Sequence, residues 1–344
     1  MEKLVVSLLE PGEESAWDGF VRGCPAATFF HLSGWRRVIE TAFGHRTFYL
    51  VARRATEICG VLPLTEVRSM IFGSSLISNA FCVHGGIAAS GPDASGQLRA
   101  AALDLARERK VGCVEFRSQY SSQQDWPTRT GLYVTFRRPI APDADANLKA
   151  IPRKQRAMIR KAIANGLRAE IDAGIDRLHH IYAQSVRRLG TPVFSKRYFQ
   201  LLKDEFGQDC DILTVLNGRR PIASVMNFYF RDEVLPYYGG GLTEARSVAG
   251  NDFMYWEVMR RASERGYRTF DFGRSKIGTG SYDFKRNWGF EPVALSYEYF
   301  PVNSRTIPDV NPFNPRYRMA INLWRRLPLF LTKLVGPAIV RSIG

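Results

Sequence analysis

Histidine and cysteine, the side chains that most often bind metals or form disulfides, are scarce in this sequence. The 344 residues include five of each, and the cysteines are scattered without C-x-x-C spacing. Zinc sites and disulfide frameworks need closely spaced or paired cysteines. His179 and His180 are adjacent on a predicted helix, so they point about 100° apart and do not share an ion in the usual i, i+4 manner. We therefore expect no metal site and reduced thiols.

Long apolar runs are also missing. No uninterrupted apolar stretch approaches the roughly 20 residues that a membrane-spanning helix needs. The first residues, MEKLVVSLLEPGEE, have too short an apolar run and too early an acidic residue for a signal peptide. We therefore expect a cytoplasmic protein. The sequence contains neither a G-x-S-x-G nucleophile elbow nor a recognisable Cys–His arrangement. It therefore gives no support to a hydrolase that works through an acyl-enzyme.

The excess of positive charge is concentrated in two segments. The net charge is +15, and residues 149–168 contain seven basic side chains and no acidic one, while residues 311–344 contain six and none. The rest of the chain is nearly neutral, which is not typical of a protein that coats nucleic acid. The length, with 45% hydrophobic and 12% aromatic residues, predicts roughly two globular domains.

Two pairs of segments repeat one pattern. Residues 30–44 (FHLSGWRRVIETAFG) parallel residues 194–207 (FSKRYFQLLKDEFG), and both run into predicted strands. Residues 112–118 (GCVEFRS) likewise parallel residues 270–275 (FDFGRS), and a predicted helix precedes each. Such self-similarity predicts that the chain contains two copies of the same fold.

A helix is predicted over 251–265, with Asn251 or Asp252 as its N-cap and Gly266 where a C-terminal cap belongs. Its apolar residues Phe253, Trp256 and Met259 recur at inward spacing. A short strand near Phe270 follows, and alternation places its neighbour Asp271 on the opposite face.

The glycine-rich segment 273–280 comes next. Backbone N–H groups and two cations could converge there on an anion; the alternative is an ordinary surface loop. The candidate substrate-binding residues of this half are Arg274, Ser275, Lys276, Tyr282, Arg286 and, in a predicted strand over 234–238, Tyr238. Beyond most of them in the sequence, Lys285 lies between aromatic residues. Aromatic neighbours exclude water from an ammonium group.

The run DFG-x-S at 271–275, followed by FK-x-x-x-G-F at 284–290, resembles the C-terminal half of FemAB-type transferases. The match is closest to the FemAB-related proteins that accompany XrtA/PEP-CTERM exopolysaccharide systems. Such proteins contain paired GNAT-like domains and move an aminoacyl or acyl group onto an amine. The resemblance places Lys285 at the reaction centre and implies a cell-envelope or exopolysaccharide precursor, lipid-linked or nucleotide-activated, as the acceptor.

Acyl transfer to an amine builds negative charge on the former carbonyl oxygen, and a fixed ammonium in a dry cleft stabilises it. We therefore assign Lys285 to this oxyanion or, alternatively, to a donor phosphate. Asp271 or Asp283 is the candidate for taking the amine's proton, a role that requires burial to raise its pKa.

The elements predicted for the second copy follow the order of a GNAT-like α/β fold, including a hairpin turned at Asn217-Gly218. We predict an α/β (α+β) protein of two tandem GNAT-like domains with mixed, mostly antiparallel sheets. The expected parts are an N-terminal domain (1–148), a basic linker helix (149–166), a C-terminal domain (167–302) and a basic amphipathic tail (303–344).

The donor remains open at this point. GNAT acetyltransferases usually hold coenzyme A in a Q/R-x-x-G-x-G/A loop, but residues 187–192 end in proline and residues 275–280 begin with serine. No tightly bound cofactor is expected. The resemblance implies a bulky anionic donor, which is aminoacyl-tRNA, acyl-carrier protein or acyl-CoA.

The linker helix is expected to face phosphate groups of tRNA or of a lipid-linked sugar, because cations without interleaved aromatics bind a backbone. The alternative is a solvated connector between domains. Its candidate residues are Arg153, Lys154, Arg156, Arg160 and Lys161.

In the first copy, Trp35, Arg36 and Arg37 are candidates for acceptor binding on a predicted helix. The alternative places the tryptophan in the core and the arginines in water. The first copy reads QYSSQQD at 119–125, where the second has its FK motif, so one reaction centre is expected.

The tail, 311–344, combines aromatic and apolar residues with cations, and Pro328 and Pro337 are predicted to break it into short helices. Such a segment can lie on an anionic membrane surface; alternatively it packs on the first domain. Three functions therefore compete: a FemAB-like transferase, which we favour, a GNAT-type N-acetyltransferase acting on an amino sugar, and a scaffold without catalysis.

Overall fold

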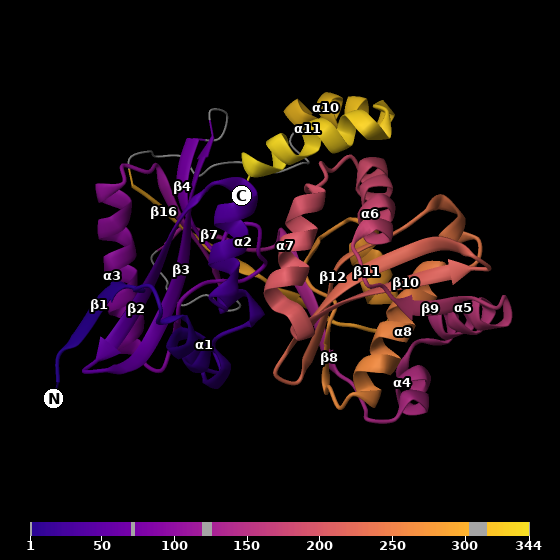
Figure 1. Cartoon of the computed structure of the whole chain (residues 1–344), viewed down its shortest axis with the longest axis horizontal. Coiled ribbons are helices and arrows are strands. Elements are labelled where there is room, and N and C mark those ends of the chain that lie inside the picture. The colour runs from indigo at the N-terminus through magenta and orange to yellow at the C-terminus, as the bar shows by residue number, and fades with distance from the viewer. Residues whose placement is uncertain (1, 70–72, 119–125, 303–314, 344) are drawn as a thin grey trace. The chain divides into compact units, whose positions relative to one another are not determined.

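The computed structural model describes residues 2–69, 73–118, 126–302 and 315–343 (Figure 1). The chain forms two compact units, each built on its own eight-stranded sheet. The first unit comprises Met1–Leu132, Leu295–Asn311 and Arg341–Gly344, and the second comprises Tyr133–Ala294 and Pro312–Val340. The units therefore divide after Leu132, earlier than the expected boundary at residue 148.

The first unit has the strand order β1-β2-β3-β4-β6-β16-β7, with β5 beside β3. Only β4 and β6 pair in parallel among the strands described in this sheet. Leu62, Leu98 and Phe116 belong to the core between the sheet and α3. The elements are β1 (Leu4–Leu8), α1 (Glu14–Gly23), η1 (Phe29–His31), α2 (Gly34–Phe43), β2 (Arg46–Arg54), β3 (Glu57–Ser69), β4 (Gly73–Ser78), β5 (Ala88–Ala89), α3 (Pro92–Glu108), β6 (Cys113–Ser118), β7 (Thr128–Arg129) and β16 (Ser296–Pro301).

The second unit has the strand order β14-β8-β13-β12-β11-β10-β9, with β15 beside β8. Helices α6 and α7 pack on one face of this sheet, and α8 packs on the other (Figure 1). The elements are β8 (Tyr133–Pro139), α4 (Ala144–Ala150), α5 (Arg153–Ala164), β9 (Arg168–Ile171), α6 (Asp176–Leu189), α7 (Lys196–Phe206), η2 (Gly207–Asp209), β10 (Cys210–Asn217), β11 (Arg220–Phe230), β12 (Glu233–Gly241), η3 (Thr243–Arg246), α8 (Gly250–Glu264), β13 (Thr269–Asp271), β14 (Ser275–Lys276), α9 (Gly280–Asn287) and β15 (Pro292–Ala294).

Two strands belong to a different sheet from the one that their position in the chain suggests. β8 was expected in the first domain, but it pairs antiparallel with β13 in the second sheet. Residues 292–301, expected in the C-terminal domain, are divided between the sheets: β15 pairs with β8 in the second sheet, while β16 pairs with β6 in the first. Alternation of side chains identifies a strand but not its partner, because partners are chosen by contacts distant in sequence.

The prediction of two α/β copies with mixed, mostly antiparallel sheets is confirmed. The hairpin at Asn217-Gly218 is present, since Asn217 pairs with Arg220 across the turn between β10 and β11. Gly218 has a φ of +62° there, which is the left-handed conformation that a tight hairpin turn needs.

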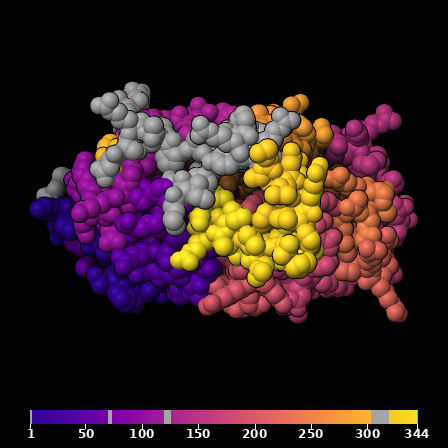
Figure 2. Space-filling view, turned by 90° about the horizontal axis from the view of Figure 1, so that it is seen from above, coloured from indigo at the N-terminus to yellow at the C-terminus, as the bar shows by residue number. Residues whose placement is uncertain are grey.

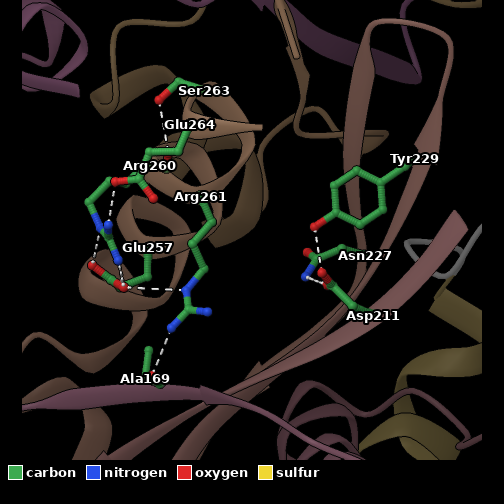
Figure 3. A network of polar contacts seen from close by, with 9 residues as sticks. All are labelled: Ala169, Asp211, Asn227, Tyr229, Glu257, Arg260, Arg261, Ser263 and Glu264. Atoms are coloured by element: carbon green, nitrogen blue, oxygen red, sulfur yellow. Dashed lines mark hydrogen bonds and ion pairs between the residues drawn. The ribbon is translucent and has the colours of Figure 1, made fainter. Parts of the chain in front are cut away.

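Helix α8 carries the predicted inward residues, because Phe253, Trp256 and Met259 are buried. Its N-cap is Ala249, however, rather than Asn251 or Asp252. Figure 3 shows how polar contacts secure its C-terminal half: the Arg261 guanidinium donates to the carbonyl oxygen of Ala169 at 2.9 Å. The helix is thus tied to β9, and its end is held where the chain turns into β13.

The C-terminal helices are α10 (Pro315–Arg326) and α11 (Leu329–Arg341), and most of both belongs to the second unit, where α10 contacts α6. Arg341, the last residue of α11, belongs to the first unit, where its carbonyl oxygen lies 2.9 Å from Nε2 of His45. The alternative expected from the sequence, packing on the first domain, therefore holds for this last residue. The Arg187 guanidinium donates to the carbonyl oxygen of Leu327 at 2.8 Å, and a Cβ at Gly190 would lie 2.5 Å from Cγ2 of Ile321. Pro328 separates the helices as predicted, but Pro337 lies inside α11.

Candidate active site

Lys285, on α9, is the central residue of the candidate site. Its side chain is buried, and Nζ donates to the carbonyl oxygens of Gly273 at 2.9 Å and Arg274 at 3.2 Å. Nζ also lies 5.7 Å from the ring centroid of Phe136 and 5.9 Å from that of Phe272. Burial lowers the pKa of Lys285 to about 7; Asp271 opposes this effect and Arg274 adds to it. Ammonium and neutral amine are therefore both accessible near neutral pH.

Asp271 ends β13 and is also buried. Its Oδ1 accepts hydrogen bonds from the backbone N–H of Gly273 at 2.7 Å and from the hydroxyl of Thr135 at 3.2 Å. Burial raises the pKa of Asp271, although these hydrogen bonds and the charges of Arg137 and Lys285 oppose the rise. Asp283, the other candidate base, is exposed on α9. The burial that a proton-accepting carboxylate requires is thus present at Asp271 and not at Asp283.

The segment predicted as a glycine-rich loop is partly a strand, because Ser275 and Lys276 form β14 and pair with β8. The half-buried Arg274 places its guanidinium 4.7 Å from the ring centroid of Tyr133. Ser275 is buried, and its Oγ has no hydrogen-bond partner among the described residues. A buried hydroxyl of this kind can bind a ligand.

Tyr282 and Arg286 lie on α9 with Lys285. The Tyr282 ring packs edge-on against Phe136 at 5.5 Å, and the exposed Arg286 has its guanidinium 5.9 Å from the Tyr282 centroid. Thr279 caps this helix by accepting a hydrogen bond from the backbone N–H of Tyr282 at 3.4 Å. The structure therefore brings Asp271, the 273–276 segment and the α9 candidates together.

Tyr238 belongs to an aromatic cluster under α6 and α7. Its hydroxyl shares a hydrogen bond of 2.8 Å with that of Tyr198, and Tyr182 packs edge-on against its ring. β12 has a bulge here, because Met226 pairs with Tyr238 and Asn227 pairs with Pro236, which leaves Tyr237 as an extra residue. β12 pairs in parallel with β13 only through Glu233 and Val234. The two parallel strands share no further ladder along the described part of β12.

The first-unit candidates do not form a site together. Trp35 is completely buried, and its indole N–H donates to the carbonyl oxygen of Phe29 at 3.2 Å. Arg36 pairs with Glu40 at 3.6 Å, and Arg37 is exposed. The structure thus places the tryptophan in the core of this unit. The segment 119–125 lies outside the described residues.

The basic helix α5 belongs to the second unit. Ile159 and Ala162 are buried in the core that α8 also lines. Two of its cations bind backbone carbonyls: Arg156 donates to Lys149 at 3.0 Å, and Lys161 donates to Ser247 at 3.1 Å. Three others are exposed: Arg153, Lys154 and Arg160.

Sequence reasoning missed two contributions to this unit. Thr135 and Phe136 come from β8, far from Lys285 in sequence, and no local signal marks them. Arg188 donates to the Thr243 hydroxyl at 2.6 Å and to the carbonyl oxygen of Gly241. Burial lowers the pKa of Arg188, and so do the charges of Arg246 and Arg187. Cations thus gather where β12 leads into α8. In the sequence, the adjacent pair Arg187-Arg188 was the feature that could have indicated this cluster.

Comparison with known proteins agrees with this geometry. Residues 153–286 match a family model described as "Acetyltransferase (GNAT) domain". No curated protein sequence matches the chain. Among solved structures, FemX has a TM-score of 0.68 at 15% identity, over 92% of this chain and 100% of its own.

Two further structures show the same fold. A tandem GNAT protein from the clavulanic acid biosynthesis pathway has a TM-score of 0.56 at 11% identity, over 88% of this chain and 100% of its own. The C-terminal domain of a putative lysylphosphatidylglycerol synthetase from Agrobacterium fabrum has a TM-score of 0.55 at 11% identity, over 85% of this chain and 92% of its own.

These likenesses define the class of protein. The chain has the fold of tandem GNAT proteins, as the sequence predicted, and its second unit carries a GNAT domain. The chain is therefore GNAT-like in fold, and the candidate site around Lys285 lies largely within the matched residues 153–286.

Proposed function

We propose that the protein is a FemAB-like transferase that moves an aminoacyl or acyl group onto an amine of a cell-envelope or exopolysaccharide precursor. The observation that carries this proposal is the buried ammonium of Lys285, held by the carbonyls of Gly273 and Arg274. A cation fixed in a dry environment can stabilise developing negative charge by a few kcal/mol.

The proposed reaction is an addition followed by an elimination. The acceptor nitrogen attacks the donor carbonyl carbon, and Lys285 stabilises the oxyanion that forms. Asp271, with its pKa raised by burial, takes the proton that the nitrogen loses. The bond from carbon to the donor oxygen or sulfur then breaks, and that atom leaves with the proton that Asp271 had accepted, which restores the carboxylate. Alternatively, Lys285 binds a donor phosphate.

The donors that suit this site are aminoacyl-tRNA, acyl-carrier protein and acyl-CoA, which all contain phosphate groups. Arg274, Lys276 and the unpartnered hydroxyl of Ser275 can bind such a group beside Lys285. Arg188 and Arg246 gather at the start of α8, where a helix N-terminus also favours an anion. The exposed cations of α5 offer contacts to tRNA.

The acceptor is proposed to be a lipid-linked or nucleotide-activated sugar, and an XrtA/PEP-CTERM exopolysaccharide system is the proposed setting. The similar structure from Agrobacterium fabrum belongs to a putative lysylphosphatidylglycerol synthetase, whose name denotes a product in which an amino acid is attached to a lipid. This supports a lipid-linked acceptor here. We propose that the protein works in the cytoplasm, at the inner face of the cytoplasmic membrane.

The test combines ligand screening with a transfer assay. Melting temperatures measured with aminoacyl-tRNA, acyl-carrier protein, acyl-CoA and UDP-sugars identify the ligands, because a ligand that binds the folded state raises stability. Single-turnover transfer should then fall about a hundredfold in Lys285→Met. Lys196→Met, which removes an exposed lysine of α7, should leave the rate unchanged. Normal turnover in Lys285→Met would remove this lysine from the mechanism.

An N-acetyltransferase acting on an amino sugar is the second candidate, favoured by the match of residues 153–286 to an acetyltransferase domain. Release of coenzyme A from acetyl-CoA in proportion to acceptor consumed would select it. If Lys285→Ala retains function in cells and no donor is consumed, the protein is a scaffold instead.

A further inference from the structure

The two C-terminal helices expose a row of large apolar side chains. Met319 is 82% exposed and Leu323 is 63% exposed on α10, while Phe330 is 69% and Leu334 is 75% exposed on α11. Residues four apart lie on the same face of a helix, so each helix presents one apolar pair. We call these four residues the tail face. Figure 2 shows the helices, in yellow, lying on the surface of the molecule.

The tail face is not the side by which the helices pack. Trp324 and Thr332 are buried on the opposite sides, and Arg325 donates to the carbonyl oxygen of Leu189 at 3.2 Å. Twelve large apolar side chains are exposed in the described residues, and the tail helices supply five of them, the tail face and Val335. Packing on α6 thus leaves the tail face uncovered within the second unit.

Cations accompany this apolar surface. Residues 315–341 contain no acidic side chain. Arg325 and Arg326 close α10 and are exposed, and Lys333 is half-buried on α11. An apolar face flanked by cations is the pattern of helices that lie in the interface of anionic lipid bilayers, where basic residues are attracted to the lipid headgroups.

We propose that the tail face docks on an anionic membrane surface. Within the described ranges no helix has the length and hydropathy of a membrane span, so the contact would be made from one side. A second copy of the chain is a poorer occupant, because it would bring two sets of cations together and like charges across an interface are unfavourable. Docking would confine the enzyme to the plane of a lipid-linked acceptor. The choice of a membrane as the partner of the tail face rests on the proposed function. The observation that these four side chains are exposed does not depend on it.

Co-sedimentation of the full chain with vesicles tests this inference. We compare phosphatidylcholine vesicles with vesicles that contain about one third phosphatidylglycerol, both free of acceptor and donor. The chain should bind only the anionic vesicles, and binding should weaken as salt rises. Leu323→Glu/Phe330→Glu should reduce the bound fraction about tenfold, since two charges replace inserted apolar groups. Arg326→Gln should reduce it less.

The matched control is Val5→Glu/Ile171→Glu, which places the same charges at exposed apolar positions of β1 and β9. This variant should bind as the unchanged chain does. Failure of the unchanged chain to bind anionic vesicles at low salt would overturn the inference, and so would equal binding by both double variants. Light scattering provides a third arm: self-association that disappears in Leu323→Glu/Phe330→Glu, with vesicle binding unchanged, would assign the surface to a second copy. Because no transfer is measured, these outcomes leave the proposed transfer reaction untouched and test only its placement at the membrane.

Discussion

The hydrogen bond from Nζ of Lys285 to the carbonyl oxygen of Gly273, 2.9 Å long, joins α9 to the second residue after β13. The same ammonium also reaches the carbonyl oxygen of Arg274. These two bonds hold a long, flexible side chain in one position. A charge that is already in place needs no reorganisation when an oxyanion forms nearby, and this preorganisation is what electrostatic catalysis requires.

The first prediction concerns stability and pH. Lys285 has a pKa of about 7 in the folded protein, below the ordinary 10.5. Between these values the unfolded chain binds a proton that the folded chain has released, so this lysine makes stability rise with pH, by up to about 1.4 kcal/mol per unit. Below pH 7 both states are protonated and the contribution is constant.

Urea unfolding of the unchanged chain and of Lys285→Met at several pH values between 7 and 10 measures this effect. The unfolding free energy of the unchanged chain minus that of Lys285→Met should become more positive as pH rises. Other titrating groups cancel in the comparison. A difference independent of pH would mean that Lys285 titrates at its ordinary pKa.

The second prediction separates the two candidate carboxylates. Asp271→Asn should lower the transfer rate by at least tenfold, because it removes the proposed proton acceptor. It also removes a negative charge that raises the pKa of Lys285, so the alkaline limb of the pH–rate profile should move to lower pH. Asp283→Asn changes an exposed carboxylate of α9 and should leave rate and profile unchanged. Equal effects of the two substitutions would contradict the assignment of Asp271.

Local elements were predictable because local chemistry determines them. The Asn217-Gly218 turn and the inward residues of α8 both follow from short-range rules. The partners of β8 and β16 were not predictable, because the sheet that each strand joins depends on contacts made by distant residues.

The environment of Lys285 illustrates the same limit. An aromatic environment was expected from its neighbours in sequence, but the rings nearest Nζ are Phe136 and Phe272, from β8 and the residue after β13. Adjacent residues of a helix point about 100° apart, so Phe284 cannot follow the direction of Lys285. The sequence predicted a dry lysine, and only the fold shows which rings surround it.

The third prediction concerns the segment around β14. Arg274→Ala/Lys276→Ala should raise the apparent KM for the donor and flatten its salt dependence, since salt screens charge-assisted contacts. Lys196→Ala/Arg197→Ala removes two exposed cations of α7 and serves as the control. Initial rates at several salt concentrations provide the measurement. If KM and its salt response are the same in both double variants, the segment has a structural role only.

The fourth prediction addresses the donor through α5. Replacing Arg153, Lys154 and Arg160 by glutamine removes its exposed cations but keeps Arg156 and Lys161, which bind backbone carbonyls and support the fold. If the donor is aminoacyl-tRNA, the affinity for tRNA should fall. The slope of log K against log salt should also decrease, by about 0.7 to 0.9 for each phosphate that the variant no longer neutralises.

Filter binding or fluorescence anisotropy over a range of salt measures both quantities. The control replaces three exposed arginines outside the basic segments by glutamine: Arg46, Arg197 and Arg219. It removes the same net charge, so a general electrostatic effect would appear equally in both triple variants, whereas a specific phosphate-binding surface would respond only to the α5 substitutions. Equal slopes in the two variants would exclude α5 as a tRNA-binding surface and favour acyl-CoA or acyl-carrier protein, whose phosphates can be bound by Arg188 and Arg246 near the start of α8.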